Sequence, residues 1–457
     1  MYAKKCNKKR YEEVFLLNRV IVIGGGWSGC AAALAARKAG AEVVLIEKTD
    51  LLLGLGNVGG IMRNNGRYTA AEENIALGAG ELFAITDELS RHRNIDFPGH
   101  QHASLYDVIK VEPYVRRFLQ EQGIEIRTMA RAIDVETESV SISIGNGKGV
   151  EKRRKYLKNI TLADGTVLAG DVFIECTGST GPMGNCLTYG NGCCMCVLRC
   201  PAFGPRVSIT QKAGLNDIMG QRKDGAFGAF SGSGKLEKAS LSDEIQRALN
   251  EKGVAIIPLL PDQVAKEKLE LKVCQQYALE EFADNIVLLD TGYAKIMTPF
   301  FPLEKLRKVP GMENARYIDP YAGGKGNSIR YLSVAERENN MKVSGIENLL
   351  CGGEKSGLFV GHTEAITTGT LAGYNAARLI KGMRPLELPP QLALGDLISY
   401  ANEKIKTKEG LLKRYTFAGA EYFERMKEKG LYTTDVQVVQ KRAKKYDLAN
   451  IYKEKIL

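Results

Sequence analysis

The amino-acid sequence predicts an α/β fold, and three observations predict it. Residues 20–33 run from four β-branched residues through a glycine turn into an alanine-rich stretch, and residues 348–380 repeat this strand–turn–helix order. Short apolar runs that lead directly into helices are typical of parallel strands buried on both faces. The alternation is lost between residues 183 and 300 and returns afterwards. We therefore expect a Rossmann-like domain built from discontinuous segments, with an inserted α+β domain and a short helical C-terminal region.

The first turn fits the pattern G-x-G-x-x-G through Gly24, Gly26 and Gly29. The first glycine permits the tight turn, the second lets a pyrophosphate approach the backbone, and the third lets helix and strand pack closely. The helix that follows begins near Trp27 and Ser28 and offers free N–H groups and a positive dipole end to phosphates. This turn predicts a dinucleotide site.

The second strand, residues 42–46, ends in an acidic residue 23 positions after the first glycine of the turn. A carboxylate at this distance is where the ribose hydroxyls of an adenosine are accepted. A glycine-rich loop over residues 51–60 comes next, too rich in glycine for a regular element and placed where a long cofactor passes close to the backbone. The candidate cofactor-binding residues here are Glu47, Lys48, Gly54, Gly59 and Gly60.

The rest of the first segment continues as alternating elements. Hydrophobic spacing predicts helices over 68–92 and 107–122, and strands over 124–127, 140–144, 158–162 and 172–176. Further candidate cofactor contacts are Ile133 and, after the last of these strands, Thr177 and Gly178. In the middle segment we expect an amphipathic helix over 242–252. The stretch 225–235 is a loop and no P-loop, because Ala229 and Leu236 replace residues that a P-loop requires.

The returning segment decides the cofactor. A strand over 348–351 leads into Gly353 and Glu354, and a helix runs from Thr363 to residue 380 after Gly361 and His362. This arrangement resembles the second half of a two-part FAD site. The resemblance implies that Glu354 meets the ribityl chain and that the helix N-terminus faces the flavin pyrimidine ring, where it stabilises negative charge. A nicotinamide domain needs no such second half, so we expect FAD.

These residues together resemble the FAD-dependent oxidoreductases with a glutathione-reductase-like cofactor domain, and within them relatives of the glucose-inhibited division protein A family. The resemblance implies an FAD-binding domain in two parts, residues 1–182 and 301–385, an inserted substrate domain over 183–300, and a helical region over 386–457. The residues that carry it are Gly24–Gly29, Glu47, Gly54–Gly60, Phe173–Gly178, Val309–Ala315, Gly345–Leu350 and the helix to Arg378.

Ten cysteines in a chain without a secretory signal are no disulfide framework, and five of them fall between Cys186 and Cys200. Cys193, Cys196 and Cys200 form C-x₂-C-x₃-C-P, which matches the last three cysteines of the bacterial ferredoxin run, with Cys186 as a fourth ligand of an iron–sulfur cluster. A thiol–disulfide pair, a zinc site and simple buried packing are the alternatives. The sequence does not choose among them.

His362 stands at the mouth of the helix that faces the flavin. A histidine there could donate to a reduced flavin or relay a proton, or it could cap the helix without chemistry. Together with Cys193, Cys196 and Cys200 it completes the candidate catalytic set.

Composition bounds the class of protein. The 457 residues are 44% hydrophobic and 25% charged, as in a soluble globular protein, and no apolar run approaches the roughly 18–20 residues of a membrane span. The basic N-terminus has no apolar core of a secretory signal, so we expect a cytoplasmic protein without a membrane partner. The net charge of +10 suits an anionic substrate, a nucleic acid or an acidic redox partner, or only a solvated lysine-rich surface. The oligomeric state stays open, with a homodimer as one option.

Two functions follow from these observations. The first is an FAD-dependent oxidoreductase that cycles electrons or hydride between the flavin and a small-molecule substrate or redox partner protein, with the cysteines nearby. The alternative, implied by the family resemblance, is a flavin-dependent enzyme that methylates or aminomethylates uridines in tRNA, using a folate one-carbon unit and a nucleophilic cysteine. Two departures argue against the alternative: the cysteine-rich segment differs from that family's active-site motif, and the C-terminal helical region is short.

Overall fold

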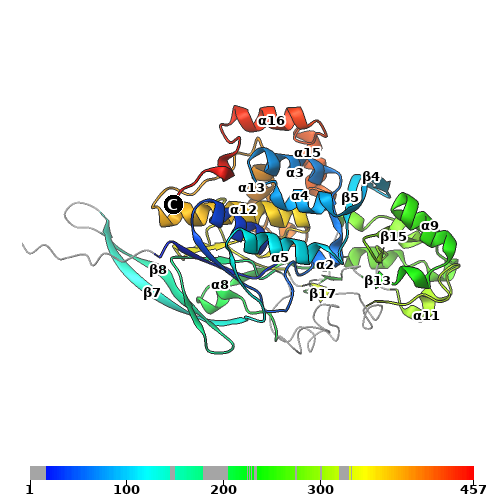
Figure 1. The fold of residues 1–457 in the computed structure, drawn as a ribbon, viewed down its shortest axis with the longest axis horizontal. Coiled ribbons are helices and arrows are strands. Elements are labelled where there is room, and N and C mark those ends of the chain that lie inside the picture. The colour runs from blue at the N-terminus through cyan, green and yellow to red at the C-terminus, as the bar shows by residue number, and fades with distance from the viewer. Residues whose placement is uncertain are drawn as a thin grey trace, which may run out of the picture.

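A five-stranded parallel sheet forms the centre of the protein, in the order β19-β10-β1-β2-β6 (Figure 1). The computed structural model describes residues 17–144, 150–178, 204–223, 225, 227, 229–230, 234–272, 275–298, 301–318, 329–330 and 332–457. The last strand in sequence pairs with β10, so segments far apart in the chain share one sheet, as expected. The strands are β1 (Arg19–Ile23), β2 (Glu42–Ile46), β6 (Glu125–Arg127), β10 (Val172–Glu175) and β19 (Leu349–Cys351).

Successive side chains of the strands point to opposite faces of this sheet, and both faces carry apolar residues that other elements cover. Val20 and Val22 pack with α1 (Trp27–Lys38) and α12 (His362–Ile380), whereas Ile21 and Ile23 pack toward a second, antiparallel sheet. The two helices touch through their backbones: a Cβ on Gly369 would lie 2.1 Å from the Ser28 carbonyl oxygen. The second sheet consists of β7 (Ala132–Ile144), β8 (Val150–Leu162) and β9 (Val167–Ala169), and its long hairpin projects from the body in Figure 1.

A second unit lies beside the parallel sheet and is built from two antiparallel sheets that share a core. One contains β13 (Lys235–Leu236), β14 (Val254–Pro258), β15 (Asn285–Asp290) and β16 (Ala294–Ile296), with α9 (Asp243–Lys252) against it. The other contains β3 (Ile61–Arg63), β4 (Ser90–Phe97) and β5 (His100–Tyr106). A separate core, between the first of these sheets and α9, takes in Phe301, Val309, Met312 and Ala315. We therefore propose that the inserted domain ends after residue 317 and not at residue 300.

The C-terminal helices stack on the helices between β3 and β4, at the top of Figure 1. The carboxylate of Glu73, which is fully buried, accepts hydrogen bonds from the backbone N–H groups of Ala393 and Leu394 and from Arg442. The predicted helical C-terminal region is therefore fixed to the body. The helices are α3 (Gly66–Ala76), α4 (Glu81–Glu88), α13 (Ala393–Lys404), α14 (Lys408–Leu411), α15 (Ala420–Glu428) and α16 (Val436–Lys445).

Two local predictions differ from the structure. The helix expected over 68–92 is split into α3 and α4 and then gives way to β4, because Gly78 adopts a left-handed φ of +96° that ends the first helix. The loop expected over 51–60 contains one helical turn, α2 (Gly56–Gly59). The remaining elements are α5 (Val111–Glu121), α8 (Ile209–Lys212), α10 (Glu281–Asp284), α11 (Leu303–Leu306), β11 (Asp217–Met219), β12 (Ala229–Phe230), β17 (Ile329–Arg330) and β18 (Ser333–Ala335).

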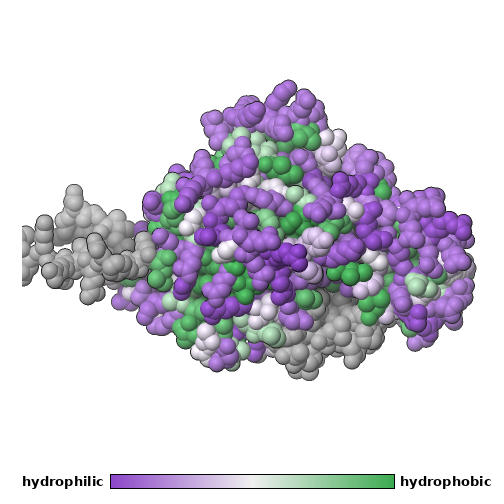
Figure 2. Space-filling view, in the orientation of Figure 1, coloured by the Kyte–Doolittle hydropathy of each residue, from purple (hydrophilic) through white to green (hydrophobic). Residues whose placement is uncertain are grey.

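The surface is polar. In Figure 2 hydrophilic residues cover most of the visible face, and apolar residues occur in small scattered groups. Among the described residues, no helix combines the length and the hydropathy that crossing a bilayer demands.

Candidate functional site

A large cavity opens at the carboxyl ends of the parallel strands and extends toward the second unit. It encloses about 1680 Å³ of empty space, which includes solvent at its mouth. The cavity reaches from the glycine turn to the N-terminus of α12, as the site of a long dinucleotide would. Of the predicted site residues, those that line it are Gly24, Gly26, Trp27, Ser28, Glu47, Lys48, Gly54, Gly59, Thr177, Gly178, Gly353, Glu354, Gly361 and His362.

Four predicted contacts lie next to the cavity and do not line it. Gly29 packs on the turn itself, and Gly60 packs on Thr291 of the second unit. Thr363 is fully buried and donates to the Met62 carbonyl oxygen at 2.7 Å. Ile133 lies on β7, one residue beyond Ala130, Arg131 and Ala132, which do line the cavity.

The glycine turn has the geometry that its sequence requires. Gly24 adopts a φ of +103°, and a Cβ on Gly29 would lie 1.8 Å from the Gly24 carbonyl oxygen. A Cβ on Gly26, in contrast, would meet no atom within 4 Å, and the same holds for Gly54 and Gly178 on the cavity wall. These three glycines leave open space where a ligand can approach the backbone, and this cradle fits the pyrophosphate and ribose parts of FAD.

Glu47 holds the turn in place as well as facing the cavity. One carboxylate oxygen accepts from the Gly25 N–H at 2.7 Å, and the other accepts from the Thr49 N–H at 2.9 Å and hydroxyl at 3.0 Å. An ionised carboxylate has about four acceptor sites, so these bonds leave capacity for the ribose hydroxyls predicted from the sequence. Lys48 next to it donates to the Gly204 carbonyl oxygen at 3.1 Å. This side of the cavity would take the adenosine.

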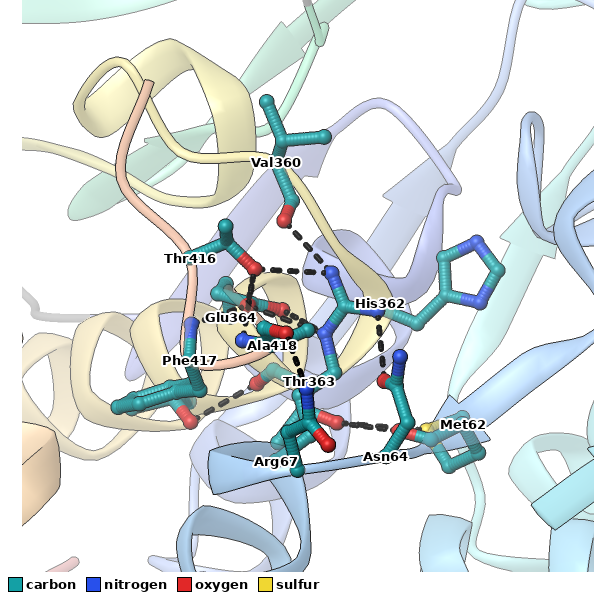
Figure 3. A network of polar contacts seen from close by, with 12 residues as sticks. Met62, Asn64, Arg67, Val360, His362, Thr363, Glu364, Thr416, Phe417 and Ala418 are labelled. Atoms are coloured by element: carbon teal, nitrogen blue, oxygen red, sulfur yellow. Dashed lines mark hydrogen bonds and ion pairs between the residues drawn. The ribbon is translucent and has the colours of Figure 1, made fainter. Parts of the chain in front are cut away.

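The other end of the cavity is formed by the N-terminus of α12, which a buried ion pair fixes (Figure 3). The Arg67 guanidinium bonds both carboxylate oxygens of Glu364 at 3.1 Å and the Val360 carbonyl oxygen at 2.8 Å. Glu364 also accepts from the Thr416 hydroxyl and the Phe417 N–H. These contacts tie α3, α12 and the C-terminal region together, so the helix N-terminus that would face the flavin is held in place.

The His362 side chain points away from this network in Figure 3 and lines the cavity. Tyr106, fully buried, donates its hydroxyl proton to the Gly56 carbonyl oxygen at 2.6 Å and accepts from the Trp27 indole at 3.4 Å. Burial raises the pKa of Tyr106, so the hydroxyl keeps its proton. Its contact with His362 Nδ1 at 3.2 Å therefore requires Nδ1–H as donor, which leaves Nε2 as the basic nitrogen of the neutral ring.

Several cavity residues were missed by the sequence analysis. Arg67 comes from α3, Arg206 comes from the segment before α8, and the second unit provides Gln276, Tyr277 and Lys295. None belongs to a local motif, because each reaches the cavity only through the packing of segments far apart in the chain. A buried arginine carries no sequence signal that separates it from a surface one.

The predicted cysteine site lies outside the described residues, since Cys186, Cys193, Cys194, Cys196 and Cys200 all fall between residues 179 and 203. The described cysteines, Cys30, Cys176 and Cys351, are buried, and burial raises the pKa of each thiol, for Cys176 and Cys351 to about 12. They are packed, unreactive thiols, as expected for the latter two. Within the described ranges no group of three or more His, Cys, Asp or Glu residues could hold a metal ion.

A model of the glucose inhibited division protein A family matches residues 19–286 and 291–384. The chain belongs to the glucose-inhibited division protein A family. Its fold is similar to that of GidA from Aquifex aeolicus in two crystal forms, with TM-scores of 0.58 and 0.56 at 16% and 17% sequence identity. These matches cover 94% and 93% of this chain and 78% and 76% of the GidA chain. The expected α/β, FAD-binding fold is thereby confirmed.

Curated relatives resemble this GidA-family chain over a short stretch. It is 35% identical over 94 residues to a methylenetetrahydrofolate–tRNA-(uracil-5-)-methyltransferase TrmFO of Caldicellulosiruptor bescii, and 33% identical over 97 residues to that of Bacillus mycoides. Each match covers 21% of this chain, and 21% and 22% of the relative. The matched stretch thus spans about a fifth of the relatives' length. None of these comparisons supports an iron–sulfur cluster, which stays a prediction.

Proposed function

We propose that this chain is an FAD-dependent enzyme that modifies a uridine of tRNA. The observation that carries the proposal is the match to the GidA family over residues 19–286 and 291–384. The TrmFO relatives, whose name states that they methylate uracil in tRNA, support the same class of substrate. The net charge of +10 favours a polyanion, and the last turn of α16 carries Lys444 and Lys445. The family match and the TrmFO relatives support this alternative better than the simple oxidoreductase expected first from the sequence, with which it shares only the use of FAD.

Methylation, the simpler of the two modifications, joins a folate carbon to a uracil base. A methylene group passes from a folate to C5 of the uracil, where a C–C bond forms and the C5 proton is released. Reduction of that carbon to a methyl group consumes two electrons, which reduced FAD bound in the cavity would supply as a hydride. The folate leaves as tetrahydrofolate, whose two nitrogens take up the C5 proton and the proton that FADH2 releases together with the hydride, so the overall products are methyluridine, tetrahydrofolate and oxidised FAD.

The protein's own residues would bind, orient and move protons in this reaction. Gly26 would let the pyrophosphate approach the backbone of the turn, and Glu47 would accept from the ribose. The N-terminus of α12 provides positive potential at the pyrimidine end of the flavin. His362, donating through Nδ1 to Tyr106, offers Nε2 on the cavity side of that helix as a proton acceptor.

The test is incubation of the FAD-loaded protein with unmodified tRNA transcripts, methylenetetrahydrofolate and a reductant without oxygen, followed by mass analysis of the nucleosides. We expect one uridine to gain a one-carbon group, and binding of tRNA to weaken steeply with salt. A matched preparation of the Gly26→Val variant, which is expected to lack FAD, should bind tRNA and leave it unchanged. The reaction is repeated with glycine or ammonium added as the amine that an aminomethyl group requires. Unmodified tRNA under all of these conditions would refute the proposal.

A second candidate rests on the five cysteines between residues 186 and 200. We propose as the alternative that they ligate an iron–sulfur cluster that feeds single electrons to the flavin. Iron and acid-labile sulfide are measured on protein purified without oxygen. About four irons for each chain, as a [4Fe–4S] cluster requires, would favour electron transfer, and iron-free protein would exclude it.

A further inference from the structure

One charged side chain on the cavity wall has an unused hydrogen-bond donor. Arg206 lines the cavity, yet it is only 5% exposed, and its Nη2 atom has no hydrogen-bond partner among the described residues. Buried polar groups in proteins are almost always paired, and a buried donor on a charged group is especially costly to leave without a partner. The unpaired donor therefore points to a ligand.

The rest of the guanidinium is held in a fixed orientation. Its Nε donates to the Thr177 hydroxyl at 3.1 Å, and that hydroxyl donates to a Glu175 carboxylate oxygen at 2.9 Å. Glu175 is fully buried and also accepts from the N–H groups of Ile209 and Thr210, which follow Arg206 in the chain. The Nε end of the planar group is thus fixed, and the Nη2 donors remain for a ligand.

The carboxylates near Arg206 are paired with another cation. The nearby carboxylates of Asp217 and Glu175 form ion pairs with Lys355, at 2.6 Å and 3.7 Å, and neither forms an ion pair with Arg206 within the described chain. Burial lowers the pKa of Arg206, and these two carboxylates partly offset the effect. A guanidinium nevertheless stays protonated in a protein, so the cavity wall carries a positive charge here.

The position of Arg206 matches the phosphates of a bound dinucleotide. Its partner Thr177 follows β10 and lies against the glycine turn, because a Cβ on Gly24 would be 3.1 Å from the Thr177 Cα. On its other side, Gly204 accepts from Lys48, which follows the ribose carboxylate. The guanidinium thus lies between the phosphate turn and the adenosine side of the cavity.

We propose that Arg206 is a phosphate-binding residue, which clamps the pyrophosphate of the dinucleotide together with the glycine turn. Arginine suits this task because its fork matches two phosphate oxygens. The inference rests on FAD as the occupant of the cavity, and it requires neither tRNA nor the reaction proposed above. Its test uses binding alone, so its failure is distinct from failure of the proposed function.

The experiment is equilibrium binding to the FAD-free full chain, with FAD followed by its fluorescence, and ADP and adenosine followed by displacement of FAD. In Arg206→Gln we expect the affinities for FAD and ADP to fall about 10- to 100-fold, the contribution of a charged hydrogen bond. Adenosine, which has no phosphate, should keep its affinity. Arg206→Lys, which keeps the charge and loses the fork, should lie between the wild type and Arg206→Gln.

The ratio of ADP affinity to adenosine affinity decides the matter, because it is measured within one protein and is insensitive to partial loss of folded protein. A ratio lowered in Arg206→Gln supports the clamp, and an unchanged ratio overturns it, whatever happens to FAD binding. The matched control is Lys212→Gln, which removes an exposed cation six residues further along the same segment. It should leave both affinities and their ratio at wild-type values.

Discussion

The hydrogen bonds around single residues define the chemistry that this cavity offers. Tyr106 has one hydroxyl proton and three polar neighbours, and the short bond to the Gly56 carbonyl oxygen uses that proton. Trp27 and His362 must then both donate to the same oxygen. No sequence motif predicts Tyr106, yet this residue determines which ring nitrogen of His362 carries the proton. His362 itself was predicted from the sequence.

The Tyr106→Phe variant tests this assignment. It leaves three polar groups without their partner, so we expect a loss of about 1–3 kcal/mol in the free energy of unfolding. The nitrogen chemical shifts of His362, now Nδ1–H, should change to a mixture of tautomers. Tyr452→Phe is the matched control, because the buried Tyr452 hydroxyl has no hydrogen-bond partner in the described chain, and its removal should cost nothing. An unchanged His362 tautomer in Tyr106→Phe would contradict the assignment.

The open space in front of Gly26 predicts a loss of cofactor without a loss of fold. Valine at position 26 has room in the protein itself, since no atom lies within 4 Å of the Cβ position and the φ of −65° suits any residue. With a pyrophosphate against the turn, the new side chain collides with it. We expect Gly26→Val to purify folded and free of flavin, as judged by its absorption spectrum.

Gly80→Val is the control for this variant, because Gly80 precedes α4 as Gly26 precedes α1 and lies away from the cavity. A Cβ there makes ordinary contact, with Ile75 at 3.4 Å. Full flavin occupancy in Gly26→Val would show that the dinucleotide lies elsewhere.

At the scale of elements, the N-terminus of α12 depends on a charge supplied by another part of the chain. Arg67 belongs to α3 and Glu364 to the first turn of α12, and both side chains are almost completely buried. Burial lowers the pKa of Arg67, but Glu364 more than offsets this and raises it. Fixing the helix whose N-terminus would face the flavin thus requires α3 to be in place.

Arg67→Met should therefore be among the most damaging single changes. It leaves the Glu364 carboxylate buried without its counter-charge, for which we expect a loss of about 3–5 kcal/mol in the free energy of unfolding. The double variant Arg67→Met with Glu364→Gln removes both charges and should recover part of that loss. Denaturant unfolding of the wild type, Arg67→Met, Glu364→Gln and the double variant measures this. Arg316→Met removes a solvent-exposed pair with Glu237 and should cost less than about 1 kcal/mol. Equal losses in the single and double variants would show that charge compensation is not the cause.

At the scale of the whole molecule, the sequence predicts the features that depend on elements adjacent in the chain. The glycine turn and Glu47 are separated by one helix and one strand, so spacing alone placed them together. The long helix after Gly361 was placed for the same reason. Gln276 and Lys295 reach the cavity only after the second unit packs against the sheet, and Arg206 only after its segment docks on the end of β10, and no periodicity encodes these contacts. The split between α3 and α4 was missed because apolar residues continue at helical spacing across it.

A cavity with walls from both units also predicts how FAD affects stability. A ligand that binds only the folded protein stabilises it by an amount that grows with its concentration, about 2.7 kcal/mol at 100 times the dissociation constant. Because Lys295 and Gln276 on one side and Gly26 and Glu354 on the other line the same cavity, FAD should stabilise both units. Thermal unfolding of FAD-free and FAD-saturated protein checks this. A shift confined to one of two transitions would contradict a shared cavity.

The pairing of β19 with β10 has a consequence for biosynthesis. Strand β19 and the N-terminus of α12 complete the sheet and one wall of the cavity, yet the ribosome makes them more than 300 residues after the glycine turn. A nascent chain therefore exposes the unpaired edge of β10 while most of its length is already outside the exit tunnel, and such edges are prone to pair with other chains. We therefore expect the chain to bind FAD only after α12 has been synthesised, so that bound FAD marks chains in which this core is complete.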